Sequence, residues 1–197
     1  PYSALIKAGE FDLLCGSTEL FLKKRGKQIT SSPIKGTIRR GQNEEEDAAL
    51  AHQLYHDTKE RAENVMICDL VRNDLSKIAA PGTVSVPELF GIHRFQTVHQ
   101  MISSVQCDIA DGVEISDIIK ATFPMGSMTG APKIRAMQLI DELEGTRRGI
   151  YSGSVCCIQP NGDFDMNVVI RSIACNRRTK RISMQVGGAI TALSDPD

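Results

Sequence analysis

The chain has 197 residues, 41% of them hydrophobic and 24% charged, which are the proportions of an ordinary globular domain with a sizeable core. Its 23 basic and 24 acidic residues leave a formal net charge of −1, so electrostatics give no reason to expect a nucleic acid or an acidic membrane as partner. No apolar run reaches the roughly 18 to 20 residues of a membrane span, and we expect a cytoplasmic enzyme of small-molecule chemistry.

The ends and the cysteines of the chain carry two further expectations. The first residue is Pro1, and the sequence starts in the middle of a pattern, so we expect residues 1–197 to be one catalytic domain that is incomplete at both ends. The cysteines form no C-x-x-C pair, and we expect them to be reduced, mostly buried thiols. They are Cys15, Cys68, Cys107, Cys156, Cys157 and Cys175.

The first half of the chain predicts strands followed by helices. Residues 11–34 have an extended pattern, with residues 25–27 as the turn of a hairpin. Residues 45–78 have the apolar spacing of two successive helices, and a Pro-Gly pair at residues 81–82 ends them. The acidic run at residues 44–47 is typical of a solvated helix start.

The second half of the chain again mixes strands with helices. Strands are predicted over residues 84–90, 97–109, 152–158, 164–175 and 181–186, and helices over residues 115–122 and from Pro132 to Gly145. This order lacks the regular alternation of a doubly wound sheet. It favours an α+β domain with a large, mainly antiparallel sheet.

Two segments carry candidate chemistry near the first sheet and its helices. Lys35 follows a strand and precedes Gly36, so it can be a nucleophile or an anion clamp, or simply a solvated loop lysine. Glu60 and Glu63 share one helix face, and their oxygens suit magnesium, although a charged helix surface explains them equally. The charged residues at 69–74 are expected to form structural ion pairs.

Three later features are open to a functional or a structural interpretation. Residues 123–133 form a glycine and hydroxyl loop that runs into a helix N-terminus, which attracts carboxylates, while Ser127 or Thr129 alternatively caps that helix. Arg171 is expected in a strand, where it grips a substrate carboxylate or faces solvent. His99 is either a polar core residue or a site residue.

Taken together, these segments resemble the chorismate-utilising enzymes, the family of anthranilate, aminodeoxychorismate, isochorismate and salicylate synthases. The similarity runs through nearly the whole chain, at residues 17–19, 33–37, 61–74, 123–133, 140–144 and 187–189. It implies the family's α/β sandwich, with two large, mainly antiparallel sheets and outer helices.

Lys35 indicates the aminodeoxychorismate synthase branch, because the anthranilate synthases resemble this chain but carry alanine there. The resemblance implies that Lys35 attacks C2 of chorismate as the 4-hydroxyl leaves, and that ammonia from a glutamine amidotransferase partner then adds at C4. The product would be 4-amino-4-deoxychorismate, which leads to p-aminobenzoate and folate. An anthranilate synthase component I and a non-catalytic chorismate-binding remnant are the alternatives.

The resemblance also implies roles for other positions. Glu19 matches a general acid, His99 matches a histidine beside the leaving hydroxyl, and Glu63 with Glu60 matches a magnesium site. Substrate contacts are implied for Gly36, Thr37, Ser127, Tyr151, Arg171, Gly187 and Ala189. We expect the chain to depart from the family in three ways: Ala189 stands where glycine is expected, the upstream part of the domain is absent, and the sequence stops before a Glu-Glu-x-x-x-Lys element that completes the magnesium site.

Overall fold

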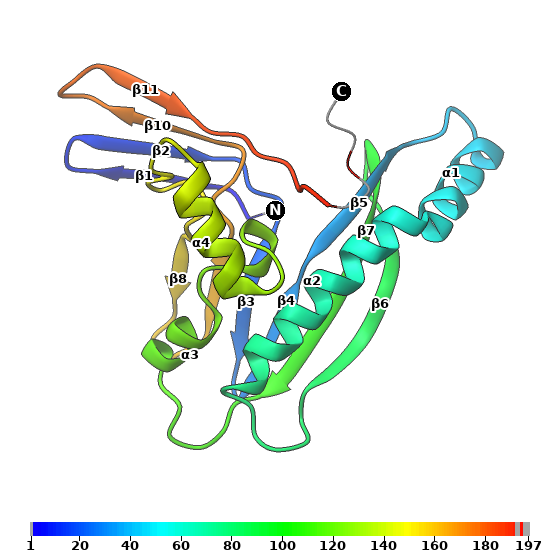
Figure 1. Ribbon diagram of the computed structural model, residues 1–197, viewed down its shortest axis with the longest axis horizontal. Coiled ribbons are helices and arrows are strands. Elements are labelled where there is room, and N and C mark those ends of the chain that lie inside the picture. Colours follow the sequence, from blue (N-terminus) through cyan, green and yellow to red (C-terminus); the bar gives the residue numbers. More distant parts are fainter. Residues whose placement is uncertain (1, 192–193, 195–197) are drawn as a thin grey trace.

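Two antiparallel sheets form the framework of the computed structural model, which describes residues 2–191 and 194 (Figure 1). The larger sheet consists of β3 (Leu20–Arg25), β4 (Gln28–Ser32), β5 (Ile34–Arg39), β6 (Ser85–Arg94), β7 (Val98–Asp108), β8 (Cys156–Ile158) and β9 (Phe164–Asn167). Its strand order is β5, β7, β4, β3, β9, β8. Strand β6 lies outside this order and also pairs with β7. The smaller sheet consists of β1 (Ala4–Ala8), β2 (Phe11–Cys15), β10 (Ser172–Asn176) and β11 (Arg181–Met184), in the order β1, β2, β10, β11.

Helices accompany these sheets, so the predicted α+β class is confirmed. They are α1 (Glu44–His56), α2 (Thr58–Ser76), α3 (Ile115–Thr122), the single 3-10 turn η1 (Gly126–Met128) and α4 (Lys133–Leu143). The predicted hairpin, the helix pair over residues 45–78 and both later helices are all present. Among the described residues, none of the helices is long and apolar enough to cross a membrane.

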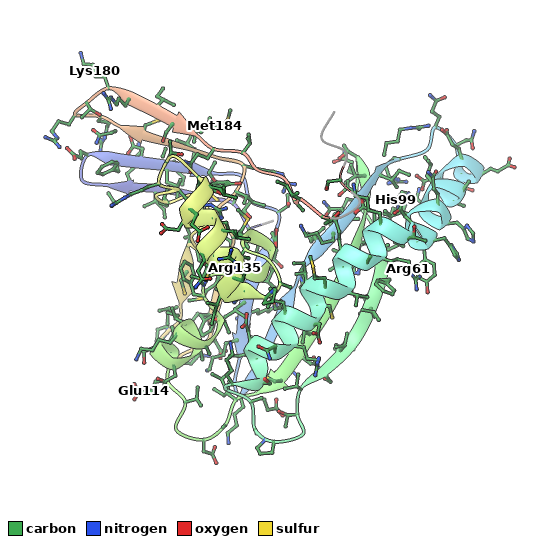
Figure 2. The ribbon with its side chains drawn as sticks, in the orientation of Figure 1. Arg61, His99, Glu114, Arg135, Lys180 and Met184 are labelled. Carbon is green, nitrogen blue, oxygen red and sulfur yellow. The ribbon has the colours of Figure 1, made fainter. Side chains whose placement is uncertain are left out.

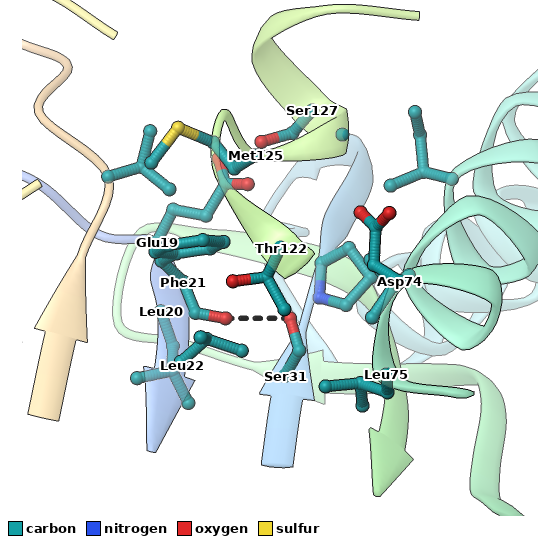
Figure 3. A pocket seen from close by; sticks show the side chains of 15 residues that line it. Glu19, Leu20, Phe21, Leu22, Ser31, Asp74, Leu75, Thr122, Met125 and Ser127 are labelled. Carbon is teal, nitrogen blue, oxygen red and sulfur yellow. Dashed lines mark hydrogen bonds between the residues drawn. The ribbon is translucent and has the colours of Figure 1, made fainter. Parts of the chain in front are cut away.

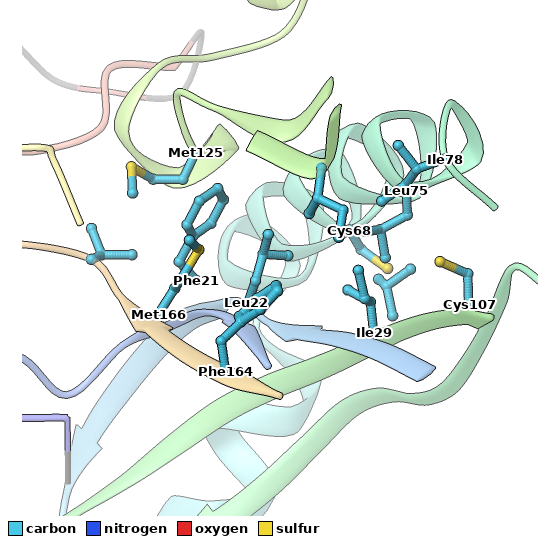
Figure 4. Packing of buried hydrophobic residues seen from close by; sticks show 13 residues of the cluster. Phe21, Leu22, Ile29, Cys68, Leu75, Ile78, Cys107, Met125, Phe164 and Met166 are labelled. Carbon is cyan, nitrogen blue, oxygen red and sulfur yellow. The ribbon is translucent and has the colours of Figure 1, made fainter. Parts of the chain in front are cut away.

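The main core lies where α2 and α3 pack on the larger sheet (Figure 4). Leu75 of α2 and Phe164 of β9 are both fully buried in it, and Ile118 of α3 closes it from the side. Helix α2 starts cleanly because the Asp57 side chain accepts a hydrogen bond of 2.9 Å from the backbone N–H of Glu60. The core therefore fixes the position of α2 over the sheet.

A buried polar bridge adds a specific contact between α2 and the sheet. Asn64 is fully buried, and its Oδ1 accepts a hydrogen bond of 2.5 Å from the hydroxyl of Ser103 on β7. The backbone N–H of Phe90 on β6 donates to the same hydroxyl at 3.0 Å. Because an unsatisfied polar group is costly to bury, these bonds favour one register of the helix on the sheet.

The sequence indicated that the acidic run at residues 44–47 is a solvated helix start, and this is wrong for its last residue. Asp47 is buried and accepts hydrogen bonds from Arg40 Nε at 2.7 Å, the Gly41 N–H at 2.8 Å and His99 Nε2 at 2.9 Å. The Arg40 guanidinium holds the pKa of the Asp47 carboxyl well below its usual range. Asp47 is buried because its hydrogen-bond partners, which lie outside residues 44–47, surround its carboxylate.

The strand predicted over residues 164–175 is also wrong as a single element. Strand β9 ends at Asn167 in the larger sheet, and β10 begins at Ser172 in the smaller one. Between them, Arg171 has φ of 51°, a left-handed conformation that a regular strand does not allow. Arg171 is therefore a bend residue where the chain crosses between sheets.

Several apolar side chains are more exposed than the sequence pattern indicates. Helix α4 has no fully buried residue, and Ile134 and Leu143, which lie on different sides of it, have exposed fractions of 74% and 78%. The six cysteines are free, but only three are buried, since Cys156 and Cys175 are half-buried and Cys157 is exposed. The expectation of mostly buried thiols therefore holds for half of them.

One face of the smaller sheet carries an apolar row that crosses all four strands. The row runs through cross-strand neighbours, from Leu5 to Leu14, then to Ile173 and finally to Met184 at the β11 edge. Figure 2 labels Met184 on this edge strand. All four side chains are exposed, Leu5 and Met184 each by 67%. The opposite face holds the small buried cluster of Leu13 and Cys15.

Shortening Leu75 to alanine should lower the free energy of unfolding by about 2 to 5 kcal/mol, because the side chain is fully buried between α2 and the sheet. Urea unfolding of the Leu75→Ala variant measures this loss. Val65→Ala is the matched control on the same helix, since Val65 is 45% exposed and should cost far less. Equal losses in the two variants would contradict this packing.

Candidate active site

A polar cavity of about 320 Å³ lies where β5, the N-terminal half of α2 and the bend before β10 meet. This volume is in the range of small-molecule sites. Eight of the twelve predicted site residues line it: Glu19, Lys35, Gly36, Thr37, Glu60, Glu63, Arg171 and Ala189. Thr18, Ile34, Lys59 and Gln100 complete the lining.

A bulge in β5 directs Lys35 and Thr37 into the cavity. The pairing of β5 with β7 shifts register between Ile34 and Thr37, and a bulge re-aims the side chains beside it. Gly36, at the centre, has φ of +95°, and a Cβ there would come within 3.1 Å of Leu54 and 3.3 Å of Glu60. The backbone conformation therefore favours glycine, and the close approach of α1 and α2 leaves little room for a side chain.

Glu19 lies just before β3, and its side chain is largely buried between the polar cavity and a smaller, mainly apolar one of about 20 Å³ (Figure 3). Burial raises the pKa of the Glu19 carboxyl above its ordinary value of 4.5. A hydrogen bond with the Ser127 side chain and the charges of Lys35 and Arg171 oppose this rise. The pKa is raised overall, and a raised pKa favours the protonated carboxyl, the form that can donate a proton.

Arg171 is held beside Glu19 by its backbone and by its side chain. Its carbonyl accepts a hydrogen bond of 3.0 Å from the N–H of Gly16, and its guanidinium donates to the hydroxyl of Thr18. Since Arg171 lines the cavity, its remaining N–H groups can grip a carboxylate. The cation thus reaches the cavity from the bend between the sheets.

Two carboxylates face the cavity from the first turns of α2. Glu60 and Glu63 are three residues apart, and the pKa of Glu60 is raised first by burial and then by the negative charge of Glu63. A hard cation would relieve that repulsion, and a carboxylate pair offers it suitable oxygen ligands. In the part of the chain that the structure describes, no third His, Cys, Asp or Glu joins them.

His99 does not reach the cavity, contrary to what the resemblance implies. His99 is buried on the other face of β7, where its Nε2 meets Asp47 at the start of α1 (Figure 2). Neighbouring residues of a strand face opposite sides, so it is Gln100, paired with Thr37 of β5, that lines the cavity. Sequence reasoning missed Gln100 because strand parity was unknown.

The other predicted residues adjoin the cavity without lining it. Ser127 interacts with Glu19 from the side of the small apolar cavity. Tyr151 lies against Gly187, where an added Cβ would come within 2.8 Å of the Tyr151 hydroxyl. A side chain on Gly187 would therefore displace the Tyr151 hydroxyl, and Ala189, two residues later, reaches the cavity. The Glu-Glu-x-x-x-Lys element is expected downstream of residues 195–197. These residues lie outside the part of the chain that the structure describes.

Among the remaining lining residues, Thr18 belongs to the 17–19 motif, whereas Lys59 carries no sequence signal beyond its place before Glu60. Lys59 lines the cavity because of the way α2 is rotated towards β5, which the sequence does not show. Lys59 of α2 and Lys35 of β5 give the cavity two amines beside the two carboxylates of α2.

Comparison with known proteins gives consistent relatives. The chain is 47% identical over 173 residues to aminodeoxychorismate synthase component 1 of Bacillus subtilis (strain 168), covering 88% of this chain and 37% of that protein. It is 41% identical to anthranilate synthase component 1 of Aquifex aeolicus (strain VF5), covering all of this chain and 40% of that protein. The crystal structure of anthranilate synthase component I from Streptococcus pneumoniae TIGR4 matches with a TM-score of 0.78 and 34% identity, over 88% of this chain and 38% of that one.

The chain thus spans less than half the length of these relatives. The family model described as chorismate binding enzyme matches residues 1–197. The fold, the motifs and this match agree, and the chain belongs to the family of chorismate-binding enzymes.

Proposed function

We propose that this chain is the chorismate-binding part of an aminodeoxychorismate synthase component I. The reaction converts chorismate and ammonia to 4-amino-4-deoxychorismate and water, with the ammonia supplied by a glutamine amidotransferase partner in the cytoplasm. The observation that carries the proposal is a primary amine, Lys35, in the same polar cavity as the buried carboxyl of Glu19. The pair offers a nucleophile and an acid for one substitution.

In this proposal, Lys35 and Glu19 act on the same C–O bond of the substrate. The neutral amine of Lys35 forms a bond to C2 of the ring, both ring double bonds shift by one position, and the 4-hydroxyl leaves with the proton of Glu19 as water. Ammonia then forms a bond to C4, both double bonds shift back, and Lys35 leaves C2 as a neutral amine. The ammonia nitrogen loses a proton to a base such as Glu19, which restores the acid.

The ends of the substrate would be held by opposite walls of the cavity. Arg171 suits the enolpyruvyl carboxylate because it is fixed by Gly16 and Thr18. Glu60 and Glu63 would hold magnesium, which when bound neutralises the ring carboxylate and polarises it. Gln100 offers a neutral amide that both donates and accepts, and so can contact a hydroxyl of the ring.

The competing activity within the family is that of anthranilate synthase component I. Relatives with either name are similarly close in sequence, so identity alone does not separate the two. Lys35 favours aminodeoxychorismate synthesis, because its amine lies in the cavity where it can form the covalent intermediate. A product that retains the enolpyruvyl group supports the proposal, while release of pyruvate contradicts it.

Lys35→Ala should reduce formation of 4-amino-4-deoxychorismate by more than about a hundredfold, because no amine remains to form the covalent intermediate. The protein at its natural length is assayed with chorismate, magnesium and ammonium. Without ammonium, intact-mass analysis should detect an adduct on Lys35 that the variant lacks. Lys120→Ala, at an exposed position of α3, is the control with unchanged turnover. Full activity of Lys35→Ala would refute the nucleophile.

Glu19→Gln should reduce turnover by about 10² to 10⁴-fold, since the amide cannot protonate the leaving hydroxyl. Its effect on stability should also depend on pH. Because the folded pKa of Glu19 is raised above 4.5, the unfolded chain loses its proton first, and folding stability falls as pH rises through this window. The melting temperature of Glu19→Gln, measured from pH 4 to 8 as approximate limits, should therefore gain on the wild type as pH increases. A constant difference would contradict the raised pKa.

His99→Ala and Gln100→Ala should separate a structural residue from a site residue. His99→Ala removes a partner of the buried Asp47 and should lower the melting temperature, with turnover at a permissive temperature nearly unchanged. Gln100→Ala should leave the melting temperature nearly unchanged and raise the KM for chorismate by about tenfold, the loss of roughly one good hydrogen bond. The reverse pattern would restore His99 as the site residue.

A further inference from the structure

Lys133 is a partly buried lysine at the start of α4 whose hydrogen-bond donors are all engaged. Its Nζ donates to the Asp74 carboxylate, to the carbonyl of Pro124 at 2.7 Å and to the carbonyl of Thr122 at 2.9 Å. The side chain is only 13% exposed. A lysine ammonium has three hydrogens, and three acceptors surround it, so the group is fully satisfied inside the protein.

The carboxylate partner comes from a different part of the fold. Asp74 lies near the C-terminal end of α2 and is itself buried. Its second oxygen accepts a hydrogen bond of 2.9 Å from Lys77, whose side chain is half exposed. Burying two charges is costly, and the loss of either one leaves the other uncompensated. The pair therefore fixes the N-terminus of α4 to α2 strongly.

The two carbonyls give this ion pair a second consequence, because one belongs to the last residue of α3 and the other to the connection between α3 and η1. The chain then passes over α2 so closely that a Cβ on Gly126 would come within 2.8 Å of Leu70. The next residue, Ser127, interacts with the Glu19 carboxyl. Glu19, Asp74 and Ser127 surround the same small cavity (Figure 3).

We propose that Lys133 and Asp74 are positioning residues for the reaction, which hold the connection from residue 122 to residue 129 so that Ser127 orients the carboxyl of Glu19. For its kinetic consequence, this inference rests on the proposed function. The ion pair does not touch the polar cavity, where the substrate would bind. It acts through backbone carbonyls and one hydroxyl, and a small displacement of an acid costs a large factor in rate.

Lys77 offers a matched control, because it bonds to the same carboxylate as Lys133. Lys77 approaches Asp74 from the solvent side and reaches only the carbonyl of Ala121, at 3.4 Å. Lys133→Met and Lys77→Met thus each remove one cation from Asp74. Only the first removes the bonds to the carbonyls of Thr122 and Pro124.

The experiment compares these two variants in the protein at its natural length, with chorismate, magnesium and ammonium. Lys133→Met should lower kcat by about ten- to a hundredfold, with the KM for chorismate changed less than about twofold. Backbone amides of residues 125–129 should exchange hydrogen faster. Lys77→Met should leave kcat and this exchange close to the wild type. The inference fails if folded Lys133→Met keeps its kcat, or if Lys77→Met loses as much.

A double-mutant cycle with Ser127→Ala tests the route of the effect. If Lys133 acts through Ser127, the Lys133→Met and Ser127→Ala double variant should lose little more kcat than either single variant. Additive losses would overturn the proposed route. Should Lys133→Met fail to fold, Asp74→Asn replaces it, since the amide keeps the shape and one acceptor.

An inactive wild type would count against the proposed function and leave a separate test of the ion pair. In that case, hydrogen exchange of the backbone amides of residues 125–129 alone tests whether the ion pair holds this segment. Unchanged protection in Lys133→Met would show that the ion pair does not hold the segment. Faster exchange in Lys133→Met, with protection retained in Lys77→Met, would support the positioning role without reference to the reaction.

Discussion

The seating of α2 on the larger sheet is the constraint on which the site depends. The buried bond between Asn64 and Ser103 and the packing of Leu75 fix the helix both along and around its axis. Glu60 near one end and Asp74 near the other are 14 residues apart, about 21 Å along a regular helix. One rigid element therefore supplies the cavity carboxylates and the anchor of the connection that holds Ser127.

Electrostatic asymmetry follows from this arrangement. Carboxylates enter the cavity from α2, while Lys35 and Arg171 enter from β5 and from the bend between the sheets. Glu19 stands apart from the α2 pair, in a drier place where burial outweighs the nearby cations. Burial is the first cause of the raised pKa at both Glu19 and Glu60, but nearby cations oppose the rise at Glu19, whereas the charge of Glu63 adds to it at Glu60.

Much of the fold could be predicted from local pattern, and the failures have identifiable physical causes. Helix α3 has the predicted bounds, since its apolar spacing and acidic start agree. Arg171 was misplaced because a change of sheet imposes a left-handed residue that β-type composition hides. Gln100 was missed and His99 was placed in the site because the sequence does not show which face of β7 each of these neighbours occupies. Most residues of the site could be predicted from the order of the motifs along the chain. The direction in which their side chains point could be known only from the fold.

The exposed apolar row across the smaller sheet bears on how these residues behave in solution. Leu5, Leu14, Ile173 and Met184 form a continuous strip that reaches the open edge of β11, and an open edge also offers unpaired backbone groups. A net charge of −1 supplies little repulsion between molecules. A polypeptide of these 197 residues alone would therefore bind environment-sensitive apolar dyes and form larger particles as its concentration rises.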